Sequence, residues 1–246
     1  IDSSQLAAIN AIIEQRIETR KPAAYLTGKA WFCGLPFHTM EGVIVPRSHI
    51  GGFLLDGGQP WIKPGSVKRI LDLCTGSGCI AVAAAMTFPD ASVDATDIDQ
   101  LALTLAEKNI AEYKLNHRIN LIESNLYQNL SATYDLILSN PPYVPHAEIA
   151  RFPAEYQHEP AAAFDGGPDG LKLVHKILSD ACNFLSDKGH IVVEVGESWT
   201  TLEEAYPVIP FNWLETGVED SGLFIMNKLE LVKYFCCWIC FSSVDF

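Results

Sequence analysis

The chain has 246 residues, 48% of them hydrophobic, and a formal net charge of −13 that comes from 17 basic and 30 acidic residues. This length suits one large domain, or one domain with a small appendage, and the apolar content is sufficient for a sizeable core. The acidic balance argues against non-specific binding to DNA or to a membrane surface, and it is compatible with a basic protein partner.

Targeting and redox features indicate a cytoplasmic protein. No signal peptide is visible and no apolar run is long enough to span a bilayer; the nearest is the tail between Phe235 and Phe241. The seven cysteines, several of them inside apolar runs, predict small core residues in a reducing compartment rather than a disulfide framework. Because the chain begins with Ile1 instead of methionine, we expect a fragment or a trimmed chain.

The first 65 residues are expected to form a helical and hairpin region. Apolar residues recur at helical spacing between residues 6 and 17, which predicts an amphipathic helix that ends before Pro22. This helix has no evident partner, so residues 1–23 are interpreted as the remnant of an N-terminal helical domain. In the linker, residues 24–65, the aromatic segment 31–37 predicts a β-hairpin, and residues 43–45 a short strand that ends at Pro46. Arg47 is either a positioned cation or an ordinary surface arginine.

The main domain is predicted over residues 66–228, where strands alternate with helices. Predicted strands cover residues 69–73, 92–97, 119–123, 134–139 and 191–195, and a closing pair covers 211–216 and 223–226. Predicted helices cover 79–86, 171–185 and 197–205, together with one that Asp99 caps. A turn is expected at 187–189. This alternation predicts an α/β fold with a doubly wound, parallel, Rossmann-like sheet.

The turn between the first strand and first helix of this domain is rich in small residues. Gly76, Gly78 and Ala81 fit the dinucleotide fingerprint, and an acid follows about 20 residues later at Asp97. Free N–H groups at the helix start favour an anionic group. The pattern suits either NAD or S-adenosylmethionine (SAM). Asp72, inside the apolar strand, favours SAM, because an acid there can anchor the turn or reach the ammonium group of the ligand through water.

A second motif, Asn140-Pro141-Pro142-Tyr143, follows the strand 134–139. Proline cannot continue a strand ladder, so this motif lies at the carboxyl end of the sheet, where ligands of open α/β sheets bind. The Asn140 side chain and the Pro141 carbonyl can accept both hydrogens of a planar –NH2 group, and Tyr143 can cover its flat face. The implied target is an amide or a base amino group. A plain strand-ending turn is the alternative.

These residues together resemble the class I SAM-dependent methyltransferases, and within them the protein-(glutamine) N-methyltransferase family. The resemblance includes residues 45–48, 94–97, 169–171 and 194–196 as well as the Asn140 motif. One branch of that family modifies class I release factors, and the other modifies protein L-three of the large ribosomal subunit. Segments 30–34 and 155–160 resemble the ribosomal-protein branch. The resemblance implies a seven-stranded class I methyltransferase sheet.

The resemblance also implies roles for individual positions. The family usually has an acid at Asn125, often an aromatic residue at Leu126, and Glu at Gly52. The implied catalytic residues are Asn140, Pro141 and Tyr143, and these bind the target glutamine together with Pro142. The implied SAM-binding residues are Asp72, Cys74, Thr75, Gly76, Ser77, Gly78, Asp97 and Ile98, with Asn125, Leu126 and Asn140.

The expected reaction is an in-line displacement that carries the methyl group to an oriented amide nitrogen, on a ribosomal protein or, as an alternative, a release factor. Three other functions stay open: an adenine-specific DNA methyltransferase, which usually has a basic surface, a non-catalytic methyltransferase-like binding protein, and a NAD-dependent oxidoreductase. No metal is expected, because Cys237-x-x-Cys240 in the atypical tail, residues 229–246, lacks a second pair of ligands. The oligomeric state is left open.

Overall fold

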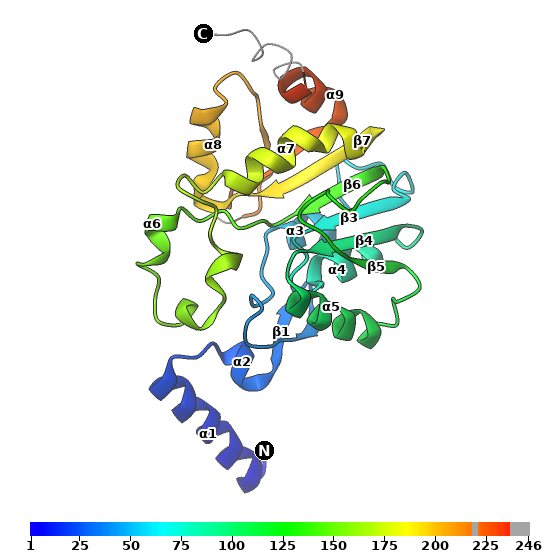
Figure 1. Ribbon diagram of the computed structural model, residues 1–246. Coiled ribbons are helices and arrows are strands. Elements are labelled where there is room, and N and C mark those ends of the chain that lie inside the picture. Colours follow the sequence, from blue (N-terminus) through cyan, green and yellow to red (C-terminus); the bar gives the residue numbers. More distant parts are fainter. Residues whose placement is uncertain (218–220, 237–246) are drawn as a thin grey trace.

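The computed structural model describes residues 1–217 and 221–236, and a seven-stranded sheet forms its centre (Figure 1). The strand order is β5-β4-β3-β6-β7-β9-β8. The strands from β5 to β7 are parallel, whereas β9 is antiparallel to both β7 and β8. The predicted doubly wound α/β sheet is confirmed, with an antiparallel edge. The bounds are β3 Arg69–Leu73, β4 Ser92–Asp97, β5 Ile119–Glu123, β6 Tyr134–Ser139, β7 Leu185–Glu194, β8 Asn212–Trp213 and β9 Leu223–Asn227.

Helices cover both faces of this sheet, because successive side chains of a strand point to opposite sides. Along β6, Leu136 and Leu138 belong to one core cluster and Ile137 belongs to the other. The first cluster includes residues of α3, α4 and α5, and the second includes residues of α7, α8 and α9. The bounds of these helices are α3 Ile50–Leu55, α4 Cys79–Thr87, α5 Gln100–Glu112, α7 Lys172–Phe184, α8 Trp199–Ala205 and α9 Lys228–Leu231.

Three local predictions were wrong. Strand β7 starts at Leu185 and includes the predicted turn 187–189, because Leu185 pairs with Tyr134 before a register shift of the bulge type. Residues 43–45 form no strand, since the Val45 N–H donates to the Glu159 carboxylate instead of to a neighbouring strand. The predicted closing strand 211–216 is reduced to the two residues of β8.

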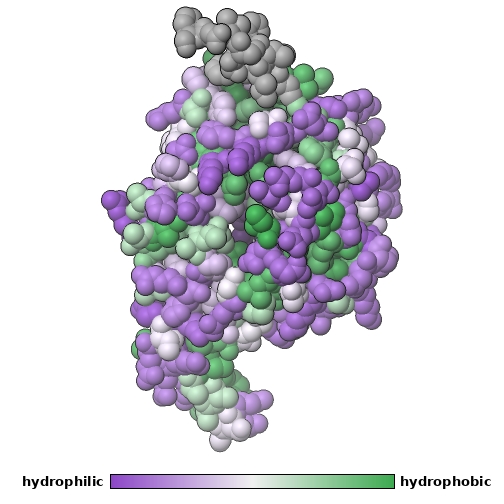
Figure 2. Space-filling model, in the orientation of Figure 1, coloured by the Kyte–Doolittle hydropathy of each residue, from purple (hydrophilic) through white to green (hydrophobic). Residues whose placement is uncertain are grey.

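The N-terminal region contains the predicted helix and hairpin. Helix α1 (Ser3–Thr19) starts with a capping box, is followed by α2 (Ala23–Thr27), and lies away from the sheet (Figure 1). Strands β1 (Lys29–Phe32) and β2 (Leu35–His38) pair in an antiparallel hairpin. Polar residues cover most of the face in Figure 2, but apolar atoms appear on α1, at the lower end. The large exposed apolar residues of this helix are Leu6, Ile9, Ile13 and Ile17.

The remaining short elements lie near the carboxyl ends of the strands or after β9. They are α6 (His146–Ile149), the 3-10 turns Tyr156–His158, Ala161–Ala163 and Gly196–Ser198, and a π-helical turn, Val232–Cys236. None of the helices in the described part of the chain combines the length and the apolar character that a bilayer span requires. The predicted Cys237-x-x-Cys240 pair lies outside the described residues.

The cysteine prediction is only partly correct. Cys33, Cys74 and Cys79 are free thiols, and Cys79 is buried in the core. Cys182 on α7 is disulfide-bonded, which the sequence did not predict, although one bonded cysteine does not make a disulfide framework.

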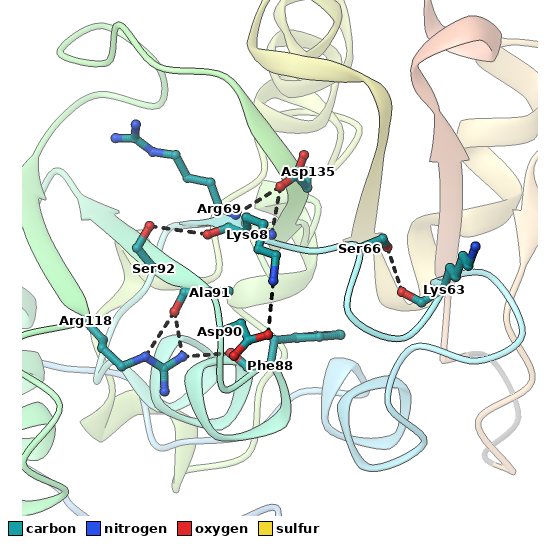
Figure 3. Close-up of polar contacts among 10 residues, drawn as sticks. All are labelled: Lys63, Ser66, Lys68, Arg69, Phe88, Asp90, Ala91, Ser92, Arg118 and Asp135. Carbon is teal, nitrogen blue, oxygen red and sulfur yellow. Dashed lines mark hydrogen bonds and ion pairs between the residues drawn. The ribbon is translucent and has the colours of Figure 1, made fainter.

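Side chains fasten the amino ends of the strands to one another (Figure 3). The Asp135 carboxylate accepts hydrogen bonds from the backbone N–H groups of Lys68 (2.8 Å) and Arg69 (3.1 Å), which ties β6 to the start of β3. The Arg118 guanidinium donates to the carbonyl oxygens of Phe88 and Ala91, and so ties the start of β5 to the loop before β4. This edge therefore serves stability, and the opposite edge is left for a binding site.

Candidate active site

A cavity of about 1230 Å³ lies at the carboxyl ends of β3, β4, β6 and β7. The predicted glycine-rich turn and the Asn140 motif lie more than 60 residues apart in the sequence, but both line this one cavity. The structure therefore joins the two motifs, as the sequence predicts. The predicted site residues that line it are Cys74, Thr75, Gly76, Ser77, Asp97, Ile98, Asn125, Leu126, Asn140, Pro141, Pro142 and Tyr143.

Asp72 and Gly78 are predicted cofactor residues that do not line the cavity. Asp72 is fully buried and accepts a 2.5 Å hydrogen bond from the Thr75 hydroxyl, so it anchors the turn, which is one of the two roles considered for it. Burial raises the pKa of the Asp72 carboxyl to about 7. Gly78 has φ +78°, and a Cβ there would lie 3.0 Å from the Ala106 Cβ. Glycine at this position therefore allows α4 to pack closely against α5.

Asp97 connects the glycine-rich turn to the end of β4. One of its oxygens accepts a hydrogen bond from the Gly76 N–H (2.9 Å), and the other accepts from the Asp99 N–H (3.0 Å). Asp99 caps α5 by accepting from the Leu101 N–H, as predicted, so Asp97 is not needed as the helix cap. Burial raises the pKa of the Asp97 carboxyl above its usual value. Each oxygen keeps a lone pair that can face the cavity.

Two residues that line the cavity adopt uncommon backbone conformations. Cys74 (φ 60°) and Leu126 (φ 52°) are non-glycine residues in the left-handed region, where local strain is commonly found near functional sites. The Ser124 hydroxyl donates to the Leu126 carbonyl (2.7 Å) and supports this turn. Gly52, where the resembled family has Glu, is exposed on α3 and does not line the cavity.

The Asn140 carboxamide has a defined direction. Its Nδ2 group donates to the Arg47 carbonyl (3.1 Å), and no described residue donates to its Oδ1 oxygen. In the described part of the chain the Pro141 carbonyl likewise receives no hydrogen bond. Both residues line the cavity. Two unused acceptors therefore lie next to each other in sequence at the end of β6.

The Tyr143 ring is held at the same end of the cavity by Glu194 and Gly196. Its hydroxyl donates to Glu194 (3.1 Å), a buried residue at the end of β7 that also accepts from the Ser48 hydroxyl (2.6 Å). Burial raises the pKa of the Glu194 carboxyl. A Cβ at Gly196 would lie 2.6 Å from the ring, so only glycine leaves room for it. The sequence analysis gave Glu194 no role, although a carboxylate inside the apolar run 191–195 could have indicated a functional residue.

Arg47 is a positioned cation and not an ordinary surface arginine. Its guanidinium makes a bidentate ion pair with Glu159 (3.0 Å for each bond) and lies 5.2 Å from the centre of the Tyr156 ring and 5.6 Å from that of Phe164. Glu159 was not predicted as a site residue, because nothing local in the sequence connects it to Arg47.

Most charged groups that line the cavity are acidic. Among the described lining residues the acids are Asp97, Asp99, Glu148, Glu194 and Glu197, whereas Arg47 is the basic residue, with His49 as a titratable neighbour. Since Arg47 is neutralised by Glu159, the lining favours cationic and hydrogen-bond-donating ligands over anions.

The sheet order and the site at its carboxyl edge define a class I SAM-dependent methyltransferase fold. The catalytic domain of hMettl16 has a similar structure, with a TM-score of 0.62 and 18% identity over 84% of this chain and 81% of that one. Residues 61–155 match the family model described as the Methyltransferase small domain.

Sequence similarity over most of the chain identifies a particular family. The chain is 47% identical over 223 residues to the ribosomal protein uL3 glutamine methyltransferase of Neisseria gonorrhoeae, covering 90% of this chain and 75% of the relative. It is 44% identical over 230 residues to the enzyme of that name from Bordetella pertussis, covering 93% and 77%. The chain belongs to the ribosomal protein uL3 glutamine methyltransferase family. The predicted resemblance to the ribosomal-protein branch is confirmed.

Proposed function

We propose that this protein transfers a methyl group from S-adenosylmethionine to the side-chain amide nitrogen of a glutamine in ribosomal protein uL3. The observation that supports this most strongly is the pair of unused acceptors, Asn140 Oδ1 and the Pro141 carbonyl, in the cavity that the glycine-rich turn also lines. The names of the relatives, at 44–47% identity, support the choice of substrate.

The half of the cavity near β3 and β4 suits SAM. The cofactor has ribose hydroxyls, an adenine amine and two cationic centres, and all of these prefer acceptors or negative charge. In this proposal Asp97 would bind the ribose hydroxyls, and Asn125 would offer an amide oxygen to the adenine amine. The backbone from Cys74 to Ser77 borders the space for the rest of the molecule, and Gly76 adopts a left-handed conformation (φ +55°) that favours glycine.

The half of the cavity near β6 and β7 suits a glutamine amide. Asn140 Oδ1 and the Pro141 carbonyl would accept its two hydrogens, while Pro142 and Tyr143 border the same space. The Tyr143 ring cannot drift, since its hydroxyl is bonded to Glu194 and its edge lies against Gly196. The amide nitrogen is thereby held in one direction.

Orientation is the main catalytic contribution of these residues. Bound SAM supplies an electrophilic methyl carbon on a sulfonium, which is a good leaving group. The amide nitrogen is a weak nucleophile because its lone pair is shared with the carbonyl, and the two acceptors favour a more pyramidal nitrogen that points at the methyl carbon. Alignment of this kind contributes up to ~7–11 kcal/mol in well-oriented reactions. Once alkylated, the amide nitrogen would be acidic and would lose its proton to water, so these residues need not supply a strong base.

Substitution of Asn140 tests this assignment. Asn140→Ala is expected to abolish methylation of purified uL3 with labelled SAM, while calorimetry shows SAM binding close to that of the wild type. Asn120→Ala is the matched control, because Asn120 lies on β5 and donates to Asp94, outside the cavity. Full activity of Asn140→Ala would refute the amide clamp. A parallel assay with a purified release factor tests the alternative substrate.

A further inference from the structure

Glu159 is a buried carboxylate that does not line the cavity, and its side-chain hydrogen bonds with described residues all come from Val45 and Arg47, which do line it. Its side chain is 4% exposed. It accepts from the Val45 backbone N–H (2.8 Å) and from both terminal nitrogens of Arg47 (3.0 Å each). These bonds cross 112–114 residues of sequence and join the loop before α7 to the loop before α3. Bidentate charge-assisted bonds of this kind fix geometry as well as add stability.

The backbone that Glu159 holds is also the backbone that orients Asn140. An asparagine side chain can place either its oxygen or its nitrogen toward a cavity, and a partner decides which. Here the Arg47 carbonyl accepts a hydrogen bond from Asn140 Nδ2 (3.1 Å), so the amide nitrogen faces Arg47. The oxygen is then left without a partner among the described residues, on a residue that lines the cavity in which the amide clamp requires an acceptor.

This loop has little regular structure to keep it in place. Residues 43–49 belong to no helix or strand. The Tyr25 hydroxyl holds their first end by donating to the Val43 carbonyl, Glu159 holds the middle, and Glu194 holds the far end through Ser48 and the His49 N–H. Glu194 also bonds Tyr143 and lines the cavity, so its substitution would disturb the site directly. Glu159 does not line the cavity and can be tested separately.

We propose that Glu159 is a positioning residue: by holding Val45 and Arg47 it keeps the Arg47 carbonyl where it turns the oxygen of Asn140 toward the substrate amide. This proposal rests on the proposed function. It adds a residue that touches neither substrate nor cofactor, and it explains why Arg47, neutralised by Glu159, borders a site that suits cationic ligands.

Glu159→Gln in the full chain tests the proposal. The substitution keeps one acceptor and the size of the side chain but loses the bidentate pair. A misplaced catalytic group typically lowers rates ~10–100-fold, so we expect a fall of that size in kcat for uL3 methylation. The SAM dissociation constant and the number of SAM sites per protein should stay within twofold of wild type. A purely structural role would instead lower kcat and SAM sites together, and that result would overturn the proposal.

Asp94→Asn is the matched control. Asp94 pairs with Arg69 (2.9 Å), and that guanidinium also lies over a tyrosine, Tyr134 (5.4 Å), but the cluster does not line the cavity. This control is expected to keep kcat within twofold of wild type, and a fall equal to that of Glu159→Gln would overturn the proposal, as would an unchanged kcat in Glu159→Gln.

A second variant and the activity of the wild-type enzyme also test the proposal. If Glu159→Gln does not fold, Glu159→Asp keeps the charge outside the cavity and shortens the side chain, which weakens its bonds to Val45 and Arg47. The kcat of this variant should fall by a smaller factor at unchanged SAM affinity, and an unchanged kcat would overturn the proposal. If wild-type enzyme leaves uL3 unmodified, the proposed function fails, and this inference fails with it.

Discussion

The contact between Gly196 and Tyr143 gives a sharp prediction. Gly196 has φ +49°, and a Cβ at this position would lie 2.6 Å from the Tyr143 Cε2 atom. Gly196→Ala therefore has two costs. The left-handed backbone costs ~1–2 kcal/mol of stability. The ring must also move by about 1 Å to reach van der Waals distance, and a displacement of that size near the chemistry costs up to ~100-fold in rate.

The ring cannot make this movement freely. Its hydroxyl is bonded to Glu194 (3.1 Å), and the Tyr143 carbonyl accepts a hydrogen bond from the Ser198 hydroxyl (2.8 Å). We therefore expect Gly196→Ala to lower the turnover of uL3 methylation ~10–100-fold, with SAM affinity retained. The assay is steady-state methylation with labelled SAM, beside urea unfolding for stability.

Gly65→Ala separates the two costs. Gly65 also has a left-handed φ, +76°, but a Cβ there would meet no atom within 4 Å. Both variants should lose a similar ~1–2 kcal/mol of stability, and only Gly196→Ala should lose turnover. Equal turnover in the two variants would refute the idea that the position of the Tyr143 ring matters for the reaction.

Two other predictions concern stability. Arg118→Ala removes hydrogen bonds of 2.6–3.1 Å to the Phe88 and Ala91 carbonyls, so it should lower the free energy of unfolding by ~1–3 kcal/mol. Lys68→Ala breaks an exposed ion pair with Asp90 and should cost under ~1 kcal/mol. Equal losses in thermal unfolding would contradict this ranking. Because burial raises the pKa of Asp72 from 3.8 to about 7, the folded state holds a proton that the unfolded state releases, so Asp72 loses its stability contribution as the pH rises through this range. The stability of Asp72→Asn relative to wild type should therefore rise with pH between these values, by at most ~1.4 kcal/mol per pH unit, and a flat difference in urea unfolding would refute the raised pKa.

The sequence alone was sufficient for the elements whose signals are local. Strands at 69–73, 92–97, 119–123 and 134–139 have the predicted bounds, because short segments rich in apolar residues between polar or turn-forming segments can be recognised from the local sequence. Asp99 caps α5 as predicted. Since parallel strands place their carboxyl ends at one edge, the sequence also determined that the glycine-rich turn and the Asn140 motif would meet.

Tertiary structure decided everything that depends on the path of long loops. Arg47 and Glu159 are 112 residues apart, and Ser48 and Glu194 are 146 apart, so no local pattern could pair them. The same is true of Gly196, whose need for glycine comes from a ring on another loop. Asp72 and Gly78 carry the expected motif but serve packing, because close contacts with Thr75 and Ala106 leave them outside the cavity. Local periodicity and capping therefore determined the elements and the edge where the site lies, whereas the direction of each side chain there follows from long-range contacts that only the folded chain provides.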